Sequence, residues 1–202
     1  ATKGGTARFA LQSDVDYTDP ALAYYQSSWN LEYATCAKLL NYPDEGTGEG
    51  SQLRPEVAKA LPTISDGGKT YTFQVRAGFA FNTGEKVTAQ TFADVINRDL
   101  AKEMNSPAQS FLSDVVGAQS VIDGKATTAS GVTAQGASLT IKLTRPAPDF
   151  LARIAMPFFC AVPQGTPVDA KGVLTPAGAG PYYIKSRVVN QRLVLARNPH
   201  YG

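Results

Sequence analysis

The chain has 202 residues, of which 43% are hydrophobic and 18% charged, and its formal net charge is +2. This length is enough for one large domain or two small ones with a buried core. The small net charge and the scattered basic residues argue against nucleic-acid binding. No stretch reaches the roughly 20 apolar residues of a transmembrane helix.

Residues 1–12 contain no apolar core of the kind that a signal peptide carries. We therefore expect either a cytoplasmic protein or one whose leader has been removed. The abundance of Gly, Ala, Thr, Ser and Gln favours the second of these.

The chain contains two cysteines, Cys36 and Cys160. Two widely separated cysteines fit one disulfide formed in an oxidising compartment. They also fit two buried free thiols, which pack as small hydrophobic side chains. The sequence leaves both interpretations open, because it does not show whether the two Cα atoms lie close enough for a bond.

The N-terminal part of the chain predicts one strand and two helices. Residues 6–12 alternate weakly and predict a strand, and the acids and Pro20 that follow predict a loop. Residues 21–40 predict a helix, because apolar residues recur there at three- and four-residue steps. The predicted buried face of this helix consists of Leu22, Tyr25, Trp29, Tyr33, Cys36, Leu39 and Leu40. An acidic, glycine-rich surface loop and a short helix starting near Pro55 come next.

Two hairpins are predicted in the middle of the chain. The first lies within residues 63–81 and turns at 66–68, where Asp and Gly supply positive φ angles. The second turns at Gly136 and Ala137. Between them, Thr88 predicts the N-cap of an amphipathic helix. The apolar residues of that helix are Phe92, Val95, Ile96 and Leu100.

The rest of the chain also predicts both helices and strands. Ser106 and Pro107 predict a further helix start, and residues 145–156 predict a short helix. Residues 157–163 predict a buried strand, and residues 181–198 predict a closing hairpin. Because hairpins outnumber βαβ crossovers, we predict a mixed α/β or α+β fold and not a doubly wound nucleotide-binding fold.

The sequence shows no catalytic or metal-binding pattern. Its single histidine, His200, and two distant cysteines make no zinc set of the usual spacing, and no nucleophile elbow is present. The glycines near Pro181 run into a strand, whereas a phosphate-binding loop opens a helix. The closely spaced acids Asp14, Asp16 and Asp19 do not match a calcium loop, so we interpret them as solvated loop residues. We expect no enzyme activity, no cofactor and no metal.

Aromatic residues crowd the segment after the first predicted strand. Trp29 and Tyr33 are expected to pack on the helix. For Tyr17, Tyr24 and Tyr25, beside the loop that Pro20 breaks, ligand contact and packing are both open. Aromatic rings with a polar tip suit a wet cleft that accepts varied ligands.

Residues 53–100 resemble the signature region of the family 5 extracellular solute-binding proteins, the peptide- and oligopeptide-binding receptors of ABC importers. The matching positions are Asp66, Lys69, Thr70, Tyr71, Phe73, Arg76, Phe81, Gly84, Thr88 and Ala89. Residues 90–92 depart from the commoner Glu-Asp-Val, and Ala179 replaces the usual Thr of a later Gly-Thr-Gly-Pro-Tyr segment. Residues 14–20 and 177–202 resemble further family segments, so the resemblance covers nearly the whole chain.

The resemblance implies a partial fold of the periplasmic-binding-protein type II kind. Residues 1–40 and 163–202 are expected to form a portion of the first ligand-binding lobe, and residues 41–162 a smaller accessory domain. Family members are longer and close two lobes over the ligand. We therefore expect the second large lobe to be lacking and the chain to be an N-terminal part truncated at Gly202.

The resemblance also implies a function. The whole protein is expected to be an extracytoplasmic component of an ABC import system, in the periplasm or anchored to the cell envelope as a lipoprotein. It would bind peptides or similar small solutes in a cleft between lobes and deliver them to permease subunits. We expect a monomer that contacts the membrane only through a removed lipid anchor or signal.

The residues expected at the ligand site are Tyr17, Asp19, Tyr24, Tyr25, Ser106, Gln109, Gly180 and Pro181. Tyr17, Asp19 and Tyr24 lie in the loop after the first predicted strand. Ser106 and Gln109 match a Ser-Pro segment that borders the cleft in the family, and the Gly-Pro pair shapes a loop near the hinge. The alternative to ligand contact is ordinary loop structure for each of these residues. For Ser106 the alternative is a helix cap.

Two other function classes stay open. The chain could be a stand-alone extracellular interaction module without a small ligand, which would require a self-sufficient core and no unpaired sheet edge at the final hairpin. An enzyme with an unrecognised Ser or Asp set ranks last. The kind of solute is also open and includes dipeptides, longer peptides, sugars and nickel complexes.

Overall fold

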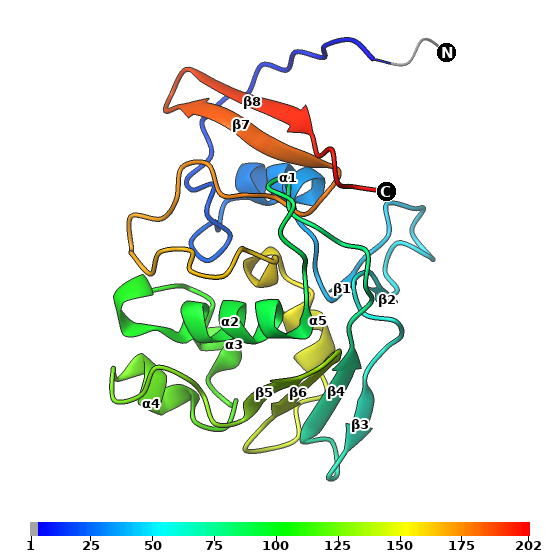
Figure 1. Cartoon of the computed structure of the whole chain (residues 1–202), viewed down its shortest axis with the longest axis vertical. Coiled ribbons are helices and arrows are strands. Elements are labelled where there is room, and N and C mark those ends of the chain that lie inside the picture. Colours follow the sequence, from blue (N-terminus) through cyan, green and yellow to red (C-terminus); the bar gives the residue numbers. More distant parts are fainter. Residues whose placement is uncertain (1–3) are drawn as a thin grey trace.

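A four-stranded antiparallel sheet lies in the lower half of Figure 1, which shows a computed structural model describing residues 4–202. Its strands in spatial order are β3 (Thr63–Ser65), β4 (Thr70–Gln74), β6 (Ser138–Lys142) and β5 (Val132–Gln135). The hairpins β3–β4 and β5–β6 meet at the β4–β6 pair, where Tyr71 faces Ile141 and Phe73 faces Leu139. Both predicted hairpins are confirmed.

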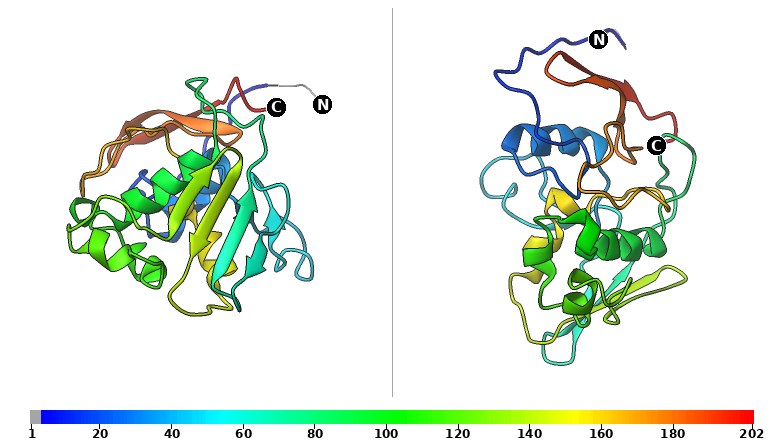
Figure 2. Two further views of the ribbon diagram at one scale, coloured as in Figure 1. Left: turned by 60° about the horizontal axis from the view of Figure 1, so that its bottom comes forward. Right: turned by 90° about the vertical axis from the view of Figure 1, so that its left-hand side faces the viewer.

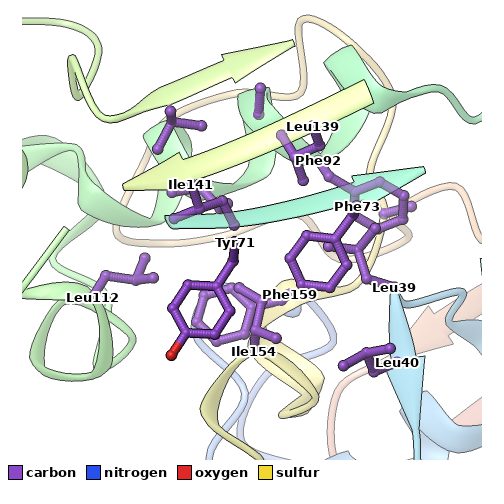
Figure 3. Packing of buried hydrophobic residues seen from close by; sticks show 14 of the residues in the cluster. Leu39, Leu40, Tyr71, Phe73, Phe92, Leu112, Leu139, Ile141, Ile154 and Phe159 are labelled. Carbon is purple, nitrogen blue, oxygen red and sulfur yellow. The ribbon is translucent and has the colours of Figure 1, made fainter. Parts of the chain in front are cut away.

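The main core lies between this sheet and the helices packed on it. Helix α2 (Ala89–Leu100) packs against β5 and β6 (Figure 2). Phe73 of β4 and Phe92 of α2 are fully buried. Side chains from α5 (Phe150–Ile154) and the 3₁₀ helix η2 (Pro157–Phe159) join the same cluster (Figure 3).

Local sequence signals account for the turn and the helix start beside this core. Asp66, Gly67 and Gly68 have φ angles of 51°, 64° and 89°, as the predicted tight turn requires. The side chain of Thr88 accepts a hydrogen bond from the Thr91 backbone N–H, and the Thr91 hydroxyl accepts one from the Thr88 backbone N–H. This capping box satisfies two backbone donors and confirms the predicted start of α2.

Short elements connect these parts. They are β1 (Leu40–Asn41), β2 (Arg54–Pro55), η1 (Lys102–Met104), α3 (Gln109–Leu112) and α4 (Ala118–Ile122). Strands β1 and β2 form a separate antiparallel pair.

A second layer contains helix α1 (Gln26–Thr35) and the hairpin of β7 (Tyr182–Val188) and β8 (Arg192–Arg197), which packs against it (Figure 1). This confirms the predicted closing hairpin. A disulfide joins Cys36, directly after α1, to Cys160, directly after η2, with the Cα atoms 5.3 Å apart. Of the two interpretations of the cysteines, the disulfide is correct.

Two predictions for the N-terminal part are wrong. Residues 6–12 are exposed and extended but pair with no strand in the described part of the chain, because weak alternation without a partner does not make a strand. The predicted helix over residues 21–40 is only α1. Tyr25 and Tyr33, predicted on its buried face, are both exposed.

Two further element types were predicted wrongly. The segment at Pro55 is a short strand and not a helix, because residues 40–41 offer backbone partners to it. Residues 157–163 are buried as predicted but begin as a 3₁₀ helix and continue without strand pairing. Burial therefore accounts for the apolar run there, as it would for a strand.

Among residues 4–202, no helix combines the length and the apolar character that crossing a bilayer requires. Residues 1–3, which begin the predicted lobe segment of residues 1–40, lie outside the described residues.

Candidate functional site

The candidate site is the loop of residues 14–25 that precedes α1, called here the tyrosine loop. Three of its aromatic side chains reach solvent: Tyr17 is 37% exposed, Tyr24 53% and Tyr25 62%. The structure therefore brings together three of the residues predicted to contact ligand. Exposed rings on one short segment form a surface that can stack on an apolar or peptide group.

Asp16 holds the tyrosine loop in shape. Its carboxylate accepts hydrogen bonds from the backbone N–H groups of Tyr17 (2.8 Å), Tyr24 (2.9 Å) and Tyr25 (3.1 Å), and from the hydroxyl of Ser28. Burial acts to raise the pKa of Asp16, but these hydrogen bonds outweigh it and lower the pKa. The interpretation of this acid as a solvated loop residue is wrong, because it accepts four bonds within the loop and α1.

The ring of Tyr24 lies on an aromatic base. It stacks on Phe158 with centroids 5.8 Å apart and meets Trp29 edge to face at 5.9 Å. Trp29 is half-buried and donates from its indole nitrogen to the carbonyl of Ala23 (2.8 Å). Trp29 packs as predicted, and together with Phe158 it holds the ring of Tyr24, a residue that stays 53% exposed.

Asp19 is buried, with 1% of its surface exposed, and its role differs from the predicted one. Its two carboxylate oxygens accept from both terminal nitrogens of Arg98 at 2.8 and 2.6 Å. One of them also accepts from the backbone N–H of Val173 (2.9 Å). A ligand reaches neither oxygen while this arrangement holds, so the prediction of direct ligand contact by Asp19 is corrected to a structural role.

Strand β7 fastens the other side of the tyrosine loop. Arg187 donates to the Thr18 hydroxyl (3.0 Å) and to the Val15 carbonyl (2.9 Å). Asp14 accepts from the backbone N–H of Asn190 at 2.7 Å. This bond, opposed by burial and aided by Arg187, lowers the pKa of Asp14. Asp14 is therefore also a structural acceptor and not merely solvated.

Ser106 and Gln109 lie inside the structure. The Ser106 hydroxyl donates to the carbonyl of Ala21 and accepts from the backbone N–H of Ala108 (3.0 Å), and the residue is buried. Ser106 therefore supports the tyrosine loop from beneath, which corrects the prediction of ligand contact. Gln109 donates from its amide to the carbonyl of Ala101 (3.1 Å) and is half-buried. A ligand contact by Gln109 stays a prediction.

Gly180 and Pro181 lie where the entry to β7 crosses the end of α1. The Gly180 N–H donates to the carbonyl of Thr35 (2.9 Å), and a Cβ there would lie 2.5 Å from the carbonyl oxygen of Cys36. The side chain of Asn198 donates to the Gly180 carbonyl (3.1 Å). The Gly-Pro pair thus sets a close backbone crossing, and its relation to a hinge stays a prediction.

Three supporting residues were missed in the sequence: Arg98, Arg187 and Asn198. The two arginines lie among polar neighbours with no local sign of a buried partner, since their acids are 79 and 173 residues away. Asn198 was noted only as part of an Asn-Pro segment. Tyr33 was predicted to be packed, but its ring is exposed, with the Lys38 ammonium 5.2 Å from its centroid.

Buried charges lie beneath the site. Burial lowers the pKa of Lys38 to about 8, opposed by Glu56 and Glu32. Its ammonium donates to the carbonyl of Ala155 (2.7 Å). For Glu32 of α1, burial raises the pKa well above its usual value, with Asp19 adding to the effect and Lys38 opposing it.

A concavity is lined by residues outside the tyrosine loop, among them Arg98, the partner of Asp19. It is an open pocket of about 580 Å³ between the C-terminal half of α2, residues 121–128 and residues 162–168. It contains none of the predicted ligand residues.

The exposed groups of the tyrosine loop are phenols and backbone. Asp14, Asp16 and Asp19, which lie in the same loop, are already hydrogen-bonded to this chain. Such a surface suits non-covalent recognition through ring stacking and hydrogen bonds.

Comparison with known proteins shows the family of the chain. Residues 52–202 match the model of the bacterial extracellular solute-binding proteins, family 5. The chain is 36% identical over 165 residues to the periplasmic murein peptide-binding protein MppA of Escherichia coli, covering 76% of this chain and 31% of MppA. It is 27% identical over 198 residues to the probable D,D-dipeptide-binding protein DdpA of the same species, covering 94% of this chain and 35% of DdpA.

Solved structures give the same result. The clavulanic acid biosynthesis oligopeptide-binding protein 2 matches with a TM-score of 0.84 and 27% identity, covering 94% of this chain and 35% of that one. The unliganded open form of MppA matches with a TM-score of 0.79 and 29% identity, covering 95% of this chain and 37% of that one. The chain thus has the predicted mixed α/β fold and spans about a third of its relatives' length. It belongs to the family 5 bacterial extracellular solute-binding proteins.

Proposed function

We propose that the protein binds peptides or similar small solutes outside the cytoplasmic membrane, as the solute-binding component of an ABC importer, and that the tyrosine loop forms part of one wall of the binding site. The observation that carries the proposal is the half-exposed ring of Tyr24, held between Trp29 and Phe158 on a loop that Asp16 fixes. A ring held in place before binding loses little conformational freedom when a ligand stacks on it.

Relatives support a peptide as the solute. MppA is described as a murein peptide-binding protein, and OppA of Haemophilus influenzae has been solved in complex with the peptide RPPGFSPFR, with 25% identity to this chain. Peptide backbones offer repeated hydrogen-bonding groups, so a receptor can hold them with little dependence on side chains.

The chain spans about a third of its relatives' length. We infer that the rest of the binding site lies in the parts of those proteins that this chain does not cover. We propose that residues 1–40 and 163–202 contribute to one ligand-binding lobe and that residues 41–162 form an accessory domain. A second lobe would close over the tyrosine loop. The protein would act as a monomer without catalytic activity and hand its solute to permease subunits. A lipid anchor or signal would provide its only attachment to the membrane.

Trp29 provides a direct test, since it is the only tryptophan of the chain and touches Tyr24. We expect an equimolar pool of tripeptides to pentapeptides to change the emission of Trp29 in a saturable manner. Replacement of Tyr24 by Ala should weaken binding by about tenfold, which is about 1.4 kcal/mol, a typical worth of a stacked ring.

The matched control is Tyr201→Ala, because Tyr201 is similarly exposed but lies outside the tyrosine loop. Peptide affinity that is unchanged in Tyr24→Ala, or lost equally in Tyr201→Ala, would remove the tyrosine loop from the site. Absence of peptide binding by the protein in any form would overturn the peptide assignment. Capture of a folded protein in place of peptides would favour the interaction-module alternative, which the family membership does not.

A further inference from the structure

The three exposed tyrosines of the tyrosine loop are gathered around one side chain. The carboxylate of Asp16 accepts hydrogen bonds from the backbone N–H groups of Tyr17, Tyr24 and Tyr25, at 2.8, 2.9 and 3.1 Å. These backbone groups come from the start and the end of the loop, and they meet at one carboxylate. Asp16 therefore brings the bases of three exposed rings together on one surface.

Tyr24 is the exposed end of a stack of three rings. Phe158 stacks on Tyr24 with centroids 5.8 Å apart and an angle of 23° between the ring planes. Phe111 stacks on Phe158 at the same separation, with an angle of 29°. Phe158 is fully buried and Phe111 half-buried, whereas Tyr24 is 53% exposed. The stack is thus most open at Tyr24, where a ring from a ligand can extend it.

The charged groups of the tyrosine loop are all engaged within the chain. Its only charged side chains are the acids Asp14, Asp16 and Asp19, and each accepts hydrogen bonds from backbone or arginine groups. The two arginines that bond to the loop, Arg98 and Arg187, have only 6% and 4% of their side chains exposed. The loop therefore meets a ligand with rings, and with neither a free carboxylate nor a free guanidinium.

We propose that the tyrosine loop makes the protein select peptides that carry an uncharged aromatic side chain, which stacks on Tyr24 as the next ring of the series. This selectivity rests on the proposed function and names the class of peptide that the site takes. A pair of aromatic rings contributes more than its buried area alone. A charged side chain in the same place would lose its water without gaining a partner from the loop, which is costly in a closed cleft.

Lysine is the strongest competitor, since the face of a tyrosine ring also attracts cations. An ammonium group brings three N–H donors, which need acceptors once a cleft closes over them. The nearest carboxylate, that of Asp16, already accepts four hydrogen bonds. A neutral ring makes no such demand, so aromatic peptides should bind more tightly than lysine peptides.

The test uses the full-length protein and isothermal titration calorimetry with tripeptides Ala-Xaa-Ala, in which Xaa is Phe, Leu, cyclohexylalanine, Glu or Lys. The same five side chains are also placed at the first and the third position. At the best position, the Phe peptide should bind about threefold to tenfold more tightly than the Leu peptide. It should bind about tenfold or more tightly than the Glu and Lys peptides. Cyclohexylalanine has the bulk of Phe without its π electrons and should bind about threefold more weakly than Phe.

Two variants assign the selectivity to the ring of Tyr24. Tyr24→Leu should abolish the preference for Phe over Leu peptides while the Leu peptide still binds, and Tyr24→Phe should keep that preference. Tyr201→Leu is the matched control and should leave the preference unchanged, because Tyr201 is exposed but lies outside the tyrosine loop. If Tyr24→Leu does not fold, the peptide series on the unchanged protein still decides.

The outcomes separate this inference from the proposed function. Equal or tighter binding of the cyclohexylalanine, Lys or Glu peptide would overturn the aromatic selectivity and leave peptide binding intact. A preference for Phe that survives in Tyr24→Leu would also overturn it, because the selectivity would then lie outside the tyrosine loop. Binding of none of the peptides would overturn the proposed function itself.

Discussion

Asp19 and Arg98 form a buried, two-pronged ion pair between residues 79 positions apart in the sequence. Asp19 belongs to the tyrosine loop and Arg98 to the last turn of α2, so the pair fastens the candidate site to the helix that covers the sheet. Arg98 also donates to the carbonyl of Pro167 at 3.0 Å. One guanidinium therefore holds three separate segments of the chain together.

Breaking this pair is expected to be strongly destabilising. Asp19→Ala leaves the Arg98 guanidinium buried without its carboxylate, and losses of about 3–5 kcal/mol are typical when one partner of a buried pair is removed. Urea unfolding measures the change. Arg54→Ala, which removes an exposed pair with Glu49, should lower the free energy of unfolding by less than about 1 kcal/mol. Similar losses in both variants would contradict a special role for the buried pair.

Removal of the Asp16 carboxylate is expected to loosen the tyrosine loop. Asp16→Ala leaves the N–H groups of Tyr24 and Tyr25 without their acceptor, and we expect a loss of about 1–3 kcal/mol in unfolding free energy. The emission of Trp29 should shift, because Tyr24 would no longer be held against it. Asp44→Ala, in the exposed acidic loop, is the control. An unchanged Trp29 spectrum in Asp16→Ala would show that the aromatic contacts alone fix the loop.

The backbone crossing at Gly180 should tolerate no side chain. In Gly180→Ala the new Cβ would lie 2.5 Å from the Cys36 carbonyl oxygen, so either β7 or the end of α1 must move. Overpacking of this kind typically lowers the free energy of unfolding by about 1–3 kcal/mol. Gly46→Ala is the matched control, because a Cβ there meets nothing within 4 Å. Thermal unfolding of both variants is the measurement, and Gly180→Ala should unfold at a lower temperature than Gly46→Ala. Equal midpoint temperatures would disprove the close crossing.

Asp99 is expected to make stability depend on pH. Burial raises the pKa of the Asp99 carboxyl well above its usual value, with Arg98 opposing and Asp19 adding to the effect. The folded state thus holds a proton that the unfolded state releases. The associated stability is complete below the unfolded pKa and is lost as pH rises through the folded one.

Asp99→Asn imitates the protonated acid, so the variant should not lose this stability as the pH rises. We expect the variant to match the unchanged chain near pH 3 and to be more stable at pH 7, by denaturant unfolding across that range. Part of the pH dependence should persist, since burial also raises the pKa of Glu32. Asp44→Asn serves as the exposed control. A variant less stable than the unchanged chain at pH 7 would show that Asp99 is ionised and held by Arg98 in the folded state.

The sequence was sufficient where a local signal decides the structure. The Asp66-Gly67-Gly68 turn needs positive φ angles, and the Thr88 cap satisfies backbone donors a few residues away, so both were predictable from neighbouring residues. The family signature lies over the same stretch, and residues 52–202 match the family model. The mixed fold, both central hairpins and the closing hairpin followed from these signals.

Contacts between distant residues needed the tertiary structure. Alternation predicted a strand at residues 6–12, but a strand also needs a partner, and none of the described strands pairs with it. Tyr25 and Tyr33 fit a helical period, yet α1 buries a different side. The acids Asp14 and Asp16 looked like solvated loop residues until their hydrogen-bond donors were in place.

The sequence by itself therefore determined the family and the fold class. Only the tertiary structure showed that Cys36 and Cys160 are bonded and that Asp19 and Ser106 are buried supports of the tyrosine loop. The physical reason is range: turns and caps are set by backbone groups a few residues apart. Burial and ion pairing depend on which distant segments the fold packs together.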